Sequence, residues 1–205
     1  MSARPSIVLR DADREDAAAL INLWRDCAET SRKEGSDVLS STALWREPGV
    51  AEAAAALELN LANPDKRIIV ALVEGEVVGA VMCDISTTTP VNLTRVLVVT
   101  ELQVLPAFRR KSVATTLLSA AANYGEEFNC EVVATLTPAH AREPNRFLTK
   151  LGFSQVSVVR ATQASMLRSK LSSKATNSRD TGKLIAVRRT LRRRQLDSGN
   201  IRNTS

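Results

Sequence analysis

The residues with the clearest chemical potential lie in the stretch TELQVLPAFRRKSVATTLL, which runs from Thr100 to Leu118. Three cations, Arg109, Arg110 and Lys111, stand where a helix is predicted to begin. A helix N-terminus already carries positive partial charge and unpaired N–H groups, so cations there are unfavourable unless an anion shares the site. Four small residues leave the amides of the first turn accessible: Ser112, Ala114, Thr115 and Thr116. The stretch therefore predicts a seat for a phosphate or diphosphate.

A carboxylate on the preceding strand is the candidate general base. Alternation along the strand predicted at 94–105 places Glu101 on one face with Leu97 and Val99. A carboxylate on a largely apolar face either has its pKa raised by desolvation or finds a partner. The alternative is that the strand simply ends in solvent at Glu101, and Asp84 on the preceding strand is a second, weaker choice.

The elements that position these residues follow from hydrophobic periodicity and turn residues. Strands are predicted at 6–10, 67–73, 77–85, 94–105, 131–136 and 153–160, and helices at about 13–28, 50–61, 111–129 and 142–151. Residues 87–94, TTTPVNLT, are predicted to be a loop. On the third long helix an apolar stripe is expected: Val113, Leu117, Ala121, Tyr124 and Phe128. This order predicts an α/β protein of the α+β type, with a mixed central sheet flanked by helices.

Length and composition indicate one domain with an appendage. The chain has 205 residues, 44% of them apolar, and no apolar run long enough to span a membrane. We expect a domain at 1–168, followed at 169–205 by a basic linker, a short helix and a disordered tail. The N-terminus lacks an apolar signal core, so a cytoplasmic location is expected. Widely spaced Cys27, Cys83 and Cys130 predict reduced, mostly buried thiols, and a single histidine argues against a histidine metal centre, so no metal is expected.

The charge is concentrated at the C-terminal end. From Arg160 to Ser205 there are twelve Lys/Arg and two acids, which gives this part +10 and the first 159 residues −4. Such a basic tail suits nucleic acid, an acidic partner or anionic lipid, and the alternative is a solubilising helix whose arginines point to water.

The run Arg109-Arg110-Lys111-Ser112-Val113-Ala114 resembles the acetyl-CoA-binding segment of the GNAT superfamily of N-acetyltransferases. That segment has the pattern Arg/Gln-x-x-Gly-x-Gly/Ala after a strand ending in Val and a turn containing Pro. Ser112 stands where the family has its first glycine: serine is tolerated if the position needs only a helical backbone, and coenzyme binding is weakened if it needs a bare Cα. A second matching segment lies at 145–153, and the resemblance covers about 6–160.

The resemblance implies acetyl-CoA as co-substrate and assigns roles along the segment. The phosphates would rest on the turn formed by Arg109, Arg110, Lys111, Ser112, Val113, Ala114 and Thr115. Backbone groups of Leu102 and Val104 would pair with the pantetheine arm, and an N–H near Val104 would polarise the thioester oxygen. Asn145 would also hold the coenzyme. Where relatives carry a tyrosine general acid, this chain has Leu148, so that role is vacant.

Two other positions border the acceptor site in GNAT proteins. Trp45 lies in the polar stretch 29–49, where substrate contact and a solvated loop are both open, and His140 lies in a loop near the cleft, where a lone histidine is more often a surface residue.

The implied activity is transfer of an acetyl group to a primary amine by direct attack in a ternary complex. The alternative is a non-catalytic acyl-CoA-binding regulatory module whose basic tail binds nucleic acid or an acidic partner, and a third hypothesis is a transferase directed by that tail to a nucleic-acid-associated protein. The expected partners are a small-molecule or protein amine as acceptor, nucleic acid or an acidic partner at the basic tail, and a second copy of the chain in a homodimer.

Overall fold

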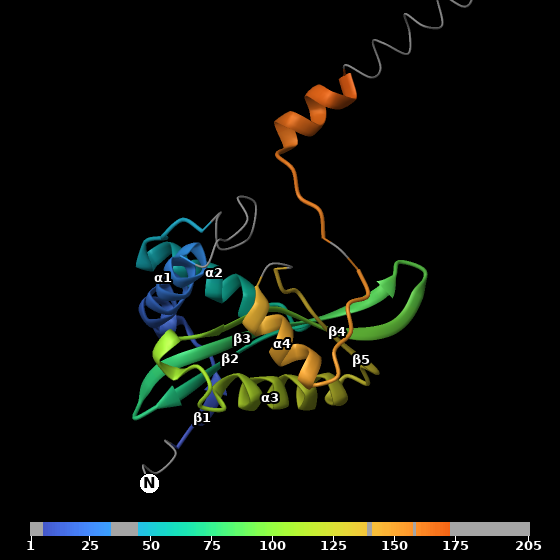
Figure 1. Ribbon diagram of the computed structural model, residues 1–205. Helices are drawn as coiled ribbons and strands as arrows, with labels where there is room; N and C mark the ends of the chain where they lie inside the picture. Colours follow the sequence, from blue (N-terminus) through green and yellow to red (C-terminus); the bar gives the residue numbers. More distant parts are fainter. Residues whose placement is uncertain (1–5, 34–44, 139–140, 158, 173–205) are drawn as a thin grey trace, which may run out of the picture. The chain divides into compact units, whose positions relative to one another are not determined.

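The computed structural model describes residues 6–33, 45–138, 141–157 and 159–172. The chain divides into two compact units, Met1–Ser154 and Gln155–Ser205. In the first unit a five-stranded mixed sheet has helices on both faces (Figure 1). The predicted α/β class with a mixed central sheet is therefore confirmed.

The strands follow one another in space in the order of the sequence, β1-β2-β3-β4-β5. The first four pair antiparallel, and β5 runs parallel to β4. The elements in chain order are β1 (Val8–Asp11), the 3-10 turn η1 (Arg14–Asp16), α1 (Ala17–Lys33), α2 (Val50–Leu61), β2 (Lys66–Val73), β3 (Glu76–Thr89), β4 (Asn92–Val104), the 3-10 turn η2 (Pro106–Phe108), α3 (Val113–Glu127), β5 (Val132–Thr135) and α4 (Arg142–Lys150).

The sheet separates two hydrophobic cores because alternate residues of its central strands point to opposite faces. On one face α3 and α4 pack against β2, β3 and β4, and the predicted α3 stripe is buried there, with Leu117 and Ala121 fully enclosed. On the other face α1 and α2 pack against β2 and β3. Tyr124 lies in the first core and donates a hydrogen bond to the Pro64 carbonyl (3.4 Å), as its predicted packing role requires.

Two predicted elements differ from the structure. The predicted loop at 87–94 is instead a continuation of the β3–β4 hairpin, in which Thr89 pairs with Asn92 across a two-residue turn. The strand predicted at 153–160 is absent from its described residues, 153–157 and 159–160. Helix is present at 164–172, where every residue is exposed. The short helix predicted near 184–191 lies outside the described residues.

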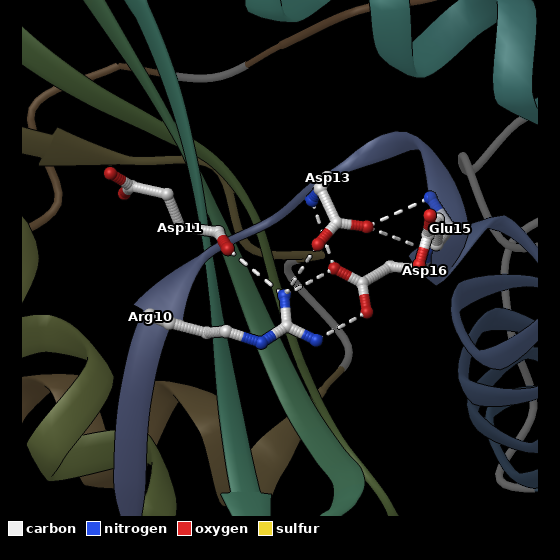
Figure 2. A network of polar contacts seen from close by, with 5 residues as sticks. All are labelled: Arg10, Asp11, Asp13, Glu15 and Asp16. Atoms are coloured by element: carbon white, nitrogen blue, oxygen red, sulfur yellow. Dashed lines mark hydrogen bonds and ion pairs between the residues drawn. The ribbon is translucent and has the colours of Figure 1, made fainter.

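A partly buried ion pair links β1 to the turn before α1 (Figure 2). The Arg10 guanidinium donates to both oxygens of Asp16, at 2.6 and 2.7 Å, and Asp16 is 6% exposed. Asp13 caps the turn: its carboxylate accepts from the amides of Glu15 and Asp16, and the Asp16 carboxylate accepts from the Asp13 amide. The hydrogen bonds from Arg10, opposed by burial, lower the pKa of Asp16.

Among the described residues, none of the helices is both long and apolar enough to cross a lipid bilayer.

Candidate functional site

A β-bulge in β4 decides where Glu101 lies. Met82 pairs with Glu101, but the next residue of β3, Cys83, pairs with Val99, so Thr100 is an extra residue in β4. Directly paired residues share a face, and Met82 packs in the core of α1 and α2. Glu101 therefore lies on the α1/α2 face, while Leu97 and Val99 lie in the α3 core. The predicted shared face was wrong, because the bulge reverses the alternation.

Glu101 is partly buried, and its Oε2 accepts a hydrogen bond from Nε2 of the Gln103 side chain at 2.7 Å. Burial raises the pKa of Glu101, and the bond from Gln103 opposes this rise. Asp84, the weaker candidate, instead contacts the Lys66 ammonium (3.3 Å) and accepts from the Thr100 hydroxyl (3.3 Å). Of the two carboxylates, Glu101 is the one without a cationic partner among the described residues.

Beyond the bulge, one edge of β4 pairs with no other strand in the part of the chain that the structure describes. Pairing with β5 ends at Val99 opposite Thr135, after which the Leu136 amide donates to the Val99 carbonyl at 3.3 Å. The Leu105 amide bonds to β3, at the Val78 carbonyl (2.9 Å), so by alternation the backbone groups of Leu102 and Val104 point to the other edge. The carbonyl of Val104 accepts from the Cys27 thiol at 3.4 Å.

The α3 N-terminus adjoins this edge. Thr116 is the residue whose amide bonds back to the Ser112 carbonyl, at 2.9 Å, so the amides of Val113, Ala114 and Thr115 precede the first intrahelical bonds. The N-cap residue Ser112 makes no side-chain capping bond in the described structure. The serine hydroxyl therefore does not block these three amides.

The backbone at Ser112 has a conformation that favours glycine. Its φ is 68° and its ψ is 0°, in the left-handed region where a side chain costs about 1 kcal/mol or more. Arg110 also has a positive φ, 61°. The sequence left two possibilities for this position: a helical backbone, which tolerates serine, or a conformation that needs glycine. The right-handed helical conformation is wrong, and Ser112 holds a conformation that glycine adopts with less strain.

Gly79 on β3 allows α3 to approach the sheet at this point. A Cβ at Gly79 would lie 2.9 Å from the Val113 side chain and 3.0 Å from the Gln103 carbonyl oxygen. Gly79 is paired with Val104, so the first turn of α3 sits directly over the end of β4. Sequence reasoning missed Gly79 and Gln103. A glycine within a β-branched run was the available signal for the first.

The three predicted cations have different surroundings. The Arg109 side chain interacts with Cys27, where it opposes the burial that raises the pKa of this thiol to about 11. Arg110 forms an ion pair with Glu143 of α4. The Lys111 ammonium lies 4.9 Å from the centre of the Phe108 ring. Positive charge thus surrounds the turn, and Glu143 neutralises part of it.

Helix α4 contributes Asn145 and Leu148. The Asn145 amide nitrogen donates to the carbonyls of Pro138 (2.9 Å) and Ala141 (2.7 Å), so both of its N–H groups are engaged within the chain. Leu148 is 8% exposed and packs in the α3 core, so the tyrosine position of relatives is occupied by a core residue here. Tyr124, bound to Pro64, is also committed to the core.

The polar stretch near Trp45 is held by ion pairs. Arg25 of α1 donates two hydrogen bonds to Glu47, at 2.8 and 2.7 Å, and Arg46 pairs with Glu52 of α2. The charges next to Trp45 thus form ion pairs within the chain. This favours a loop over substrate contact for this stretch. His140 lies outside the described residues.

An open pocket of about 300 Å³ lies between α1 and the turn after β4. Its lining residues are Asp26, Glu29, Thr30, Lys33, Leu105, Pro106 and Ala107. Within the described ranges no three His, Cys, Asp or Glu residues gather as a metal site would require, and all three cysteines are free thiols, with Cys27 and Cys83 buried.

The family profile described as the Acetyltransferase (GNAT) family matches residues 19–153, about two-thirds of the chain. The chain therefore belongs to the GNAT acetyltransferase family, and the predicted resemblance is confirmed. The match includes the bulged β4 strand, the turn at 109–112 and α4. A search of curated proteins found no significant match.

Solved structures share the fold at low sequence identity. A transcriptional regulator from Bacillus halodurans C-125 is 17% identical, with a TM-score of 0.64 over 77% of this chain and 99% of its own. The aminoglycoside N-acetyltransferase AAC(6')-Iy, in complex with CoA, is 18% identical, with a TM-score of 0.60 over 80% and 98%. A putative acetyltransferase from Agrobacterium tumefaciens str. C58 is 23% identical, with a TM-score of 0.60 over 76% and 99%.

Proposed function

We propose that this chain is an acetyl-CoA-dependent N-acetyltransferase that acts on a primary amine by direct attack in a ternary complex. The proposal depends on two features that occur together: a β4 edge at Leu102 and Val104 that pairs with no described strand, and amides in the first turn of α3 that precede the first intrahelical bond. The edge offers hydrogen bonds to an extended arm, and the turn offers N–H groups and nearby cations to phosphates. Acetyl-CoA carries both chemical groups in one molecule.

In the proposed reaction the amine nitrogen attacks the thioester carbonyl carbon, a C–N bond forms, and the C–S bond breaks. The Val104 amide donates to the carbonyl oxygen as negative charge develops there. Glu101 accepts the proton that the attacking amine loses, and its raised pKa brings its basicity closer to this task. The leaving thiolate takes a proton from solvent, because no described residue replaces the general acid lost at Leu148.

The acceptor class is a cationic small-molecule amine. Support comes from the pocket lined by Asp26 and Glu29 beside the end of β4, and from the net charge of −4 over the first 159 residues. Two structural neighbours are aminoglycoside acetyltransferases. An aminoglycoside, a polyamine and a lysine-containing peptide therefore form the first acceptor panel.

Calorimetry with acetyl-CoA and with CoA tests coenzyme binding, and transfer across the acceptor panel tests activity. We expect 1:1 binding of both ligands and turnover of at least one amine. Glu101→Gln should lower kcat/KM by about 10²- to 10⁴-fold while leaving acetyl-CoA binding unchanged. Asp84→Asn is the matched control and should change the rate far less. An unchanged rate in Glu101→Gln removes Glu101 from the mechanism.

The burial of Leu148 favours one second candidate, a non-catalytic acyl-CoA-binding module, since a core leucine cannot protonate a leaving group. In that case calorimetry would show acetyl-CoA binding while no amine of the panel is acetylated. Its proposed basic extension, with Arg168 and Lys170 on an exposed helix, would then bind nucleic acid or an acidic partner. Binding that persists after deletion of 164–205 would exclude the extension as the docking element.

A further inference from the structure

The polar side of β4 beyond the bulge holds two side chains, Glu101 and Gln103, and they bond to each other. They are two residues apart, so both project to the α1/α2 face. Their neighbours across the strand pair on β3 are Met82 and Ala80, which offer no polar side-chain groups. The Gln103 amide is therefore the donor that the carboxylate meets on its own sheet face.

We propose that Gln103 is a positioning residue, which holds the Glu101 carboxylate through Oε2 and leaves Oε1 directed to the acceptor amine. The proposal rests on the proposed function of Glu101 as the base. The bond occupies one carboxylate oxygen at 2.7 Å, and the described structure gives Oε1 no hydrogen-bond donor. Without the bond, a partly buried glutamate would sample several rotamers, and only a fraction would face the amine.

The bulge at Thr100 makes this arrangement possible. If β4 alternated regularly through Thr100, without the bulge, Glu101 would fall on the α3 face with Leu97 and Val99, where the core is apolar. The bulge turns Glu101 and Gln103 together to the other face while Leu102 and Val104 take up core positions beside α3. The bulge thus places both members of the polar pair on the α1/α2 face.

Other titratable groups on this face have partners of their own. Asp84 of β3 contacts Lys66 of β2 and Thr100, and Cys27 of α1 bonds the Val104 carbonyl. The residues that α2 buries here, Ala54 and Leu57, are apolar. The pKa of Glu101 is set by burial, which raises it, and by the Gln103 donor, which lowers it. Removal of the donor should therefore raise this pKa further.

The test measures the titration of the Glu101 side-chain carboxyl by ¹³C NMR in the full chain, with Glu101→Gln to assign the signal. Gln103→Met keeps the length of the side chain and removes the donor, and Gln103→Asn is a second variant whose amide is too short to reach. Both should raise the pKa of Glu101, because each removes the donor that lowers it. Gln155→Met, at an exposed glutamine outside the pair, should leave it unchanged.

The catalytic readout is the pH profile of kcat/KM with the best amine of the panel. The acidic limb should move to higher pH in Gln103→Met by the same amount as the titration, with kcat about 3- to 30-fold lower and the KM for acetyl-CoA unchanged. An unmoved Glu101 titration in both variants overturns the proposal, as does a titration shift that the acidic limb does not follow. Failure of the proposed function appears separately, as absent acetyl-CoA binding or as full activity in Glu101→Gln.

Discussion

The two halves of β4 have different surroundings although they belong to one continuous strand. From Val96 to Val99 the strand pairs on both edges, with β3 and with β5, and Leu97 and Val99 are completely buried. From Glu101 to Val104 the only described strand that it pairs with is β3, and every residue from Thr100 to Val104 is partly exposed. The extra residue Thr100 marks the boundary. Residues that stabilise the fold and residues proposed to bind ligand are thus only a few positions apart, separated by one bulge.

The largest expected effect is a difference in stability between substitutions in the two halves of β4. Leu97→Ala removes a side chain that is 0% exposed in the α3 core, so we expect a loss of about 2–5 kcal/mol in the free energy of unfolding. Leu102→Ala, at a partly exposed position in the second half, should cost less than half as much. Urea unfolding monitored by circular dichroism provides both values. Equal losses at the two positions would contradict the division.

The second prediction concerns the contact between the end of β4 and α3. Gly79→Ser adds a Cβ that meets the Val113 side chain at 2.9 Å and the Gln103 carbonyl at 3.0 Å, so α3 must shift. We expect a loss of about 1–3 kcal/mol in stability together with weaker CoA binding. Gly49→Ser is the matched control, because nothing lies within 4 Å of its Cβ and serine is a good N-cap for α2. Unfolding and calorimetry on both variants give the comparison, and CoA binding unaltered by Gly79→Ser would contradict the proposed position of the ligand.

The third prediction uses two carboxylates whose pKa values shift in opposite directions. The pKa of Glu101 is raised, so the folded state favours its protonated form, and stability falls as pH rises between the unfolded and folded pKa values. Glu101→Gln should therefore be more stable than wild type at pH 8, with the difference disappearing near pH 4. Thermal unfolding of both proteins between pH 4 and pH 8 measures this difference. A Glu101→Gln variant less stable than wild type at pH 8 would contradict a Glu101 pKa that is raised by burial.

Asp16 supplies the contrast, because Arg10 lowers its pKa. Its contribution to stability is present above the ordinary aspartate pKa of about 3.9 and is lost as pH falls through the lower folded-state value. Asp16→Asn should therefore destabilise the protein at pH 7 and show a flatter loss of stability below pH 4. The same unfolding series on this variant measures both effects. Parallel acid profiles for the variant and wild type would contradict the lowered pKa.

The smallest expected effect concerns the positive φ at Ser112. Ser112→Gly relieves the left-handed strain and should stabilise the fold by about 0.4–1 kcal/mol, with CoA binding unchanged or tighter. Glu74→Gly, at φ 53° in the turn between β2 and β3, should give a similar gain in stability with no effect on CoA. Differential scanning calorimetry and CoA titration distinguish them. Weaker CoA binding in Ser112→Gly would show that the hydroxyl itself contacts the ligand.

The sequence predicted the elements well where hydrophobic periodicity is unambiguous. The predicted bounds of α2 agree with the structure, and the α3 stripe was correct because Leu117 and Ala121 follow the helical period that buries one face. The β3–β4 hairpin was harder, since its threonines and Pro90 resemble a loop while the strands extend beyond the sheet into solvent.

The position of the polar pair could not be predicted in the same way. The strand VLVVTELQV carries apolar residues on both faces, so its pattern contains no mark of an inserted residue, and Thr100 is an ordinary strand residue. The positive φ at Ser112 was likewise hidden by a serine where glycine would have signalled it. The bond between Arg10 and Asp16 depends on a capping turn that places two residues six apart in contact.

The central claim is that the open half of β4 and the first turn of α3 together hold the coenzyme. The most direct measurement is a titration of CoA into ¹⁵N-labelled protein, followed by amide NMR with Leu97 and Val99 as internal references. The account predicts that the largest chemical-shift changes occur at the amides of Leu102, Val104 and residues 113–115, with little change at the references. Saturable CoA binding that leaves these five amides unperturbed would contradict it.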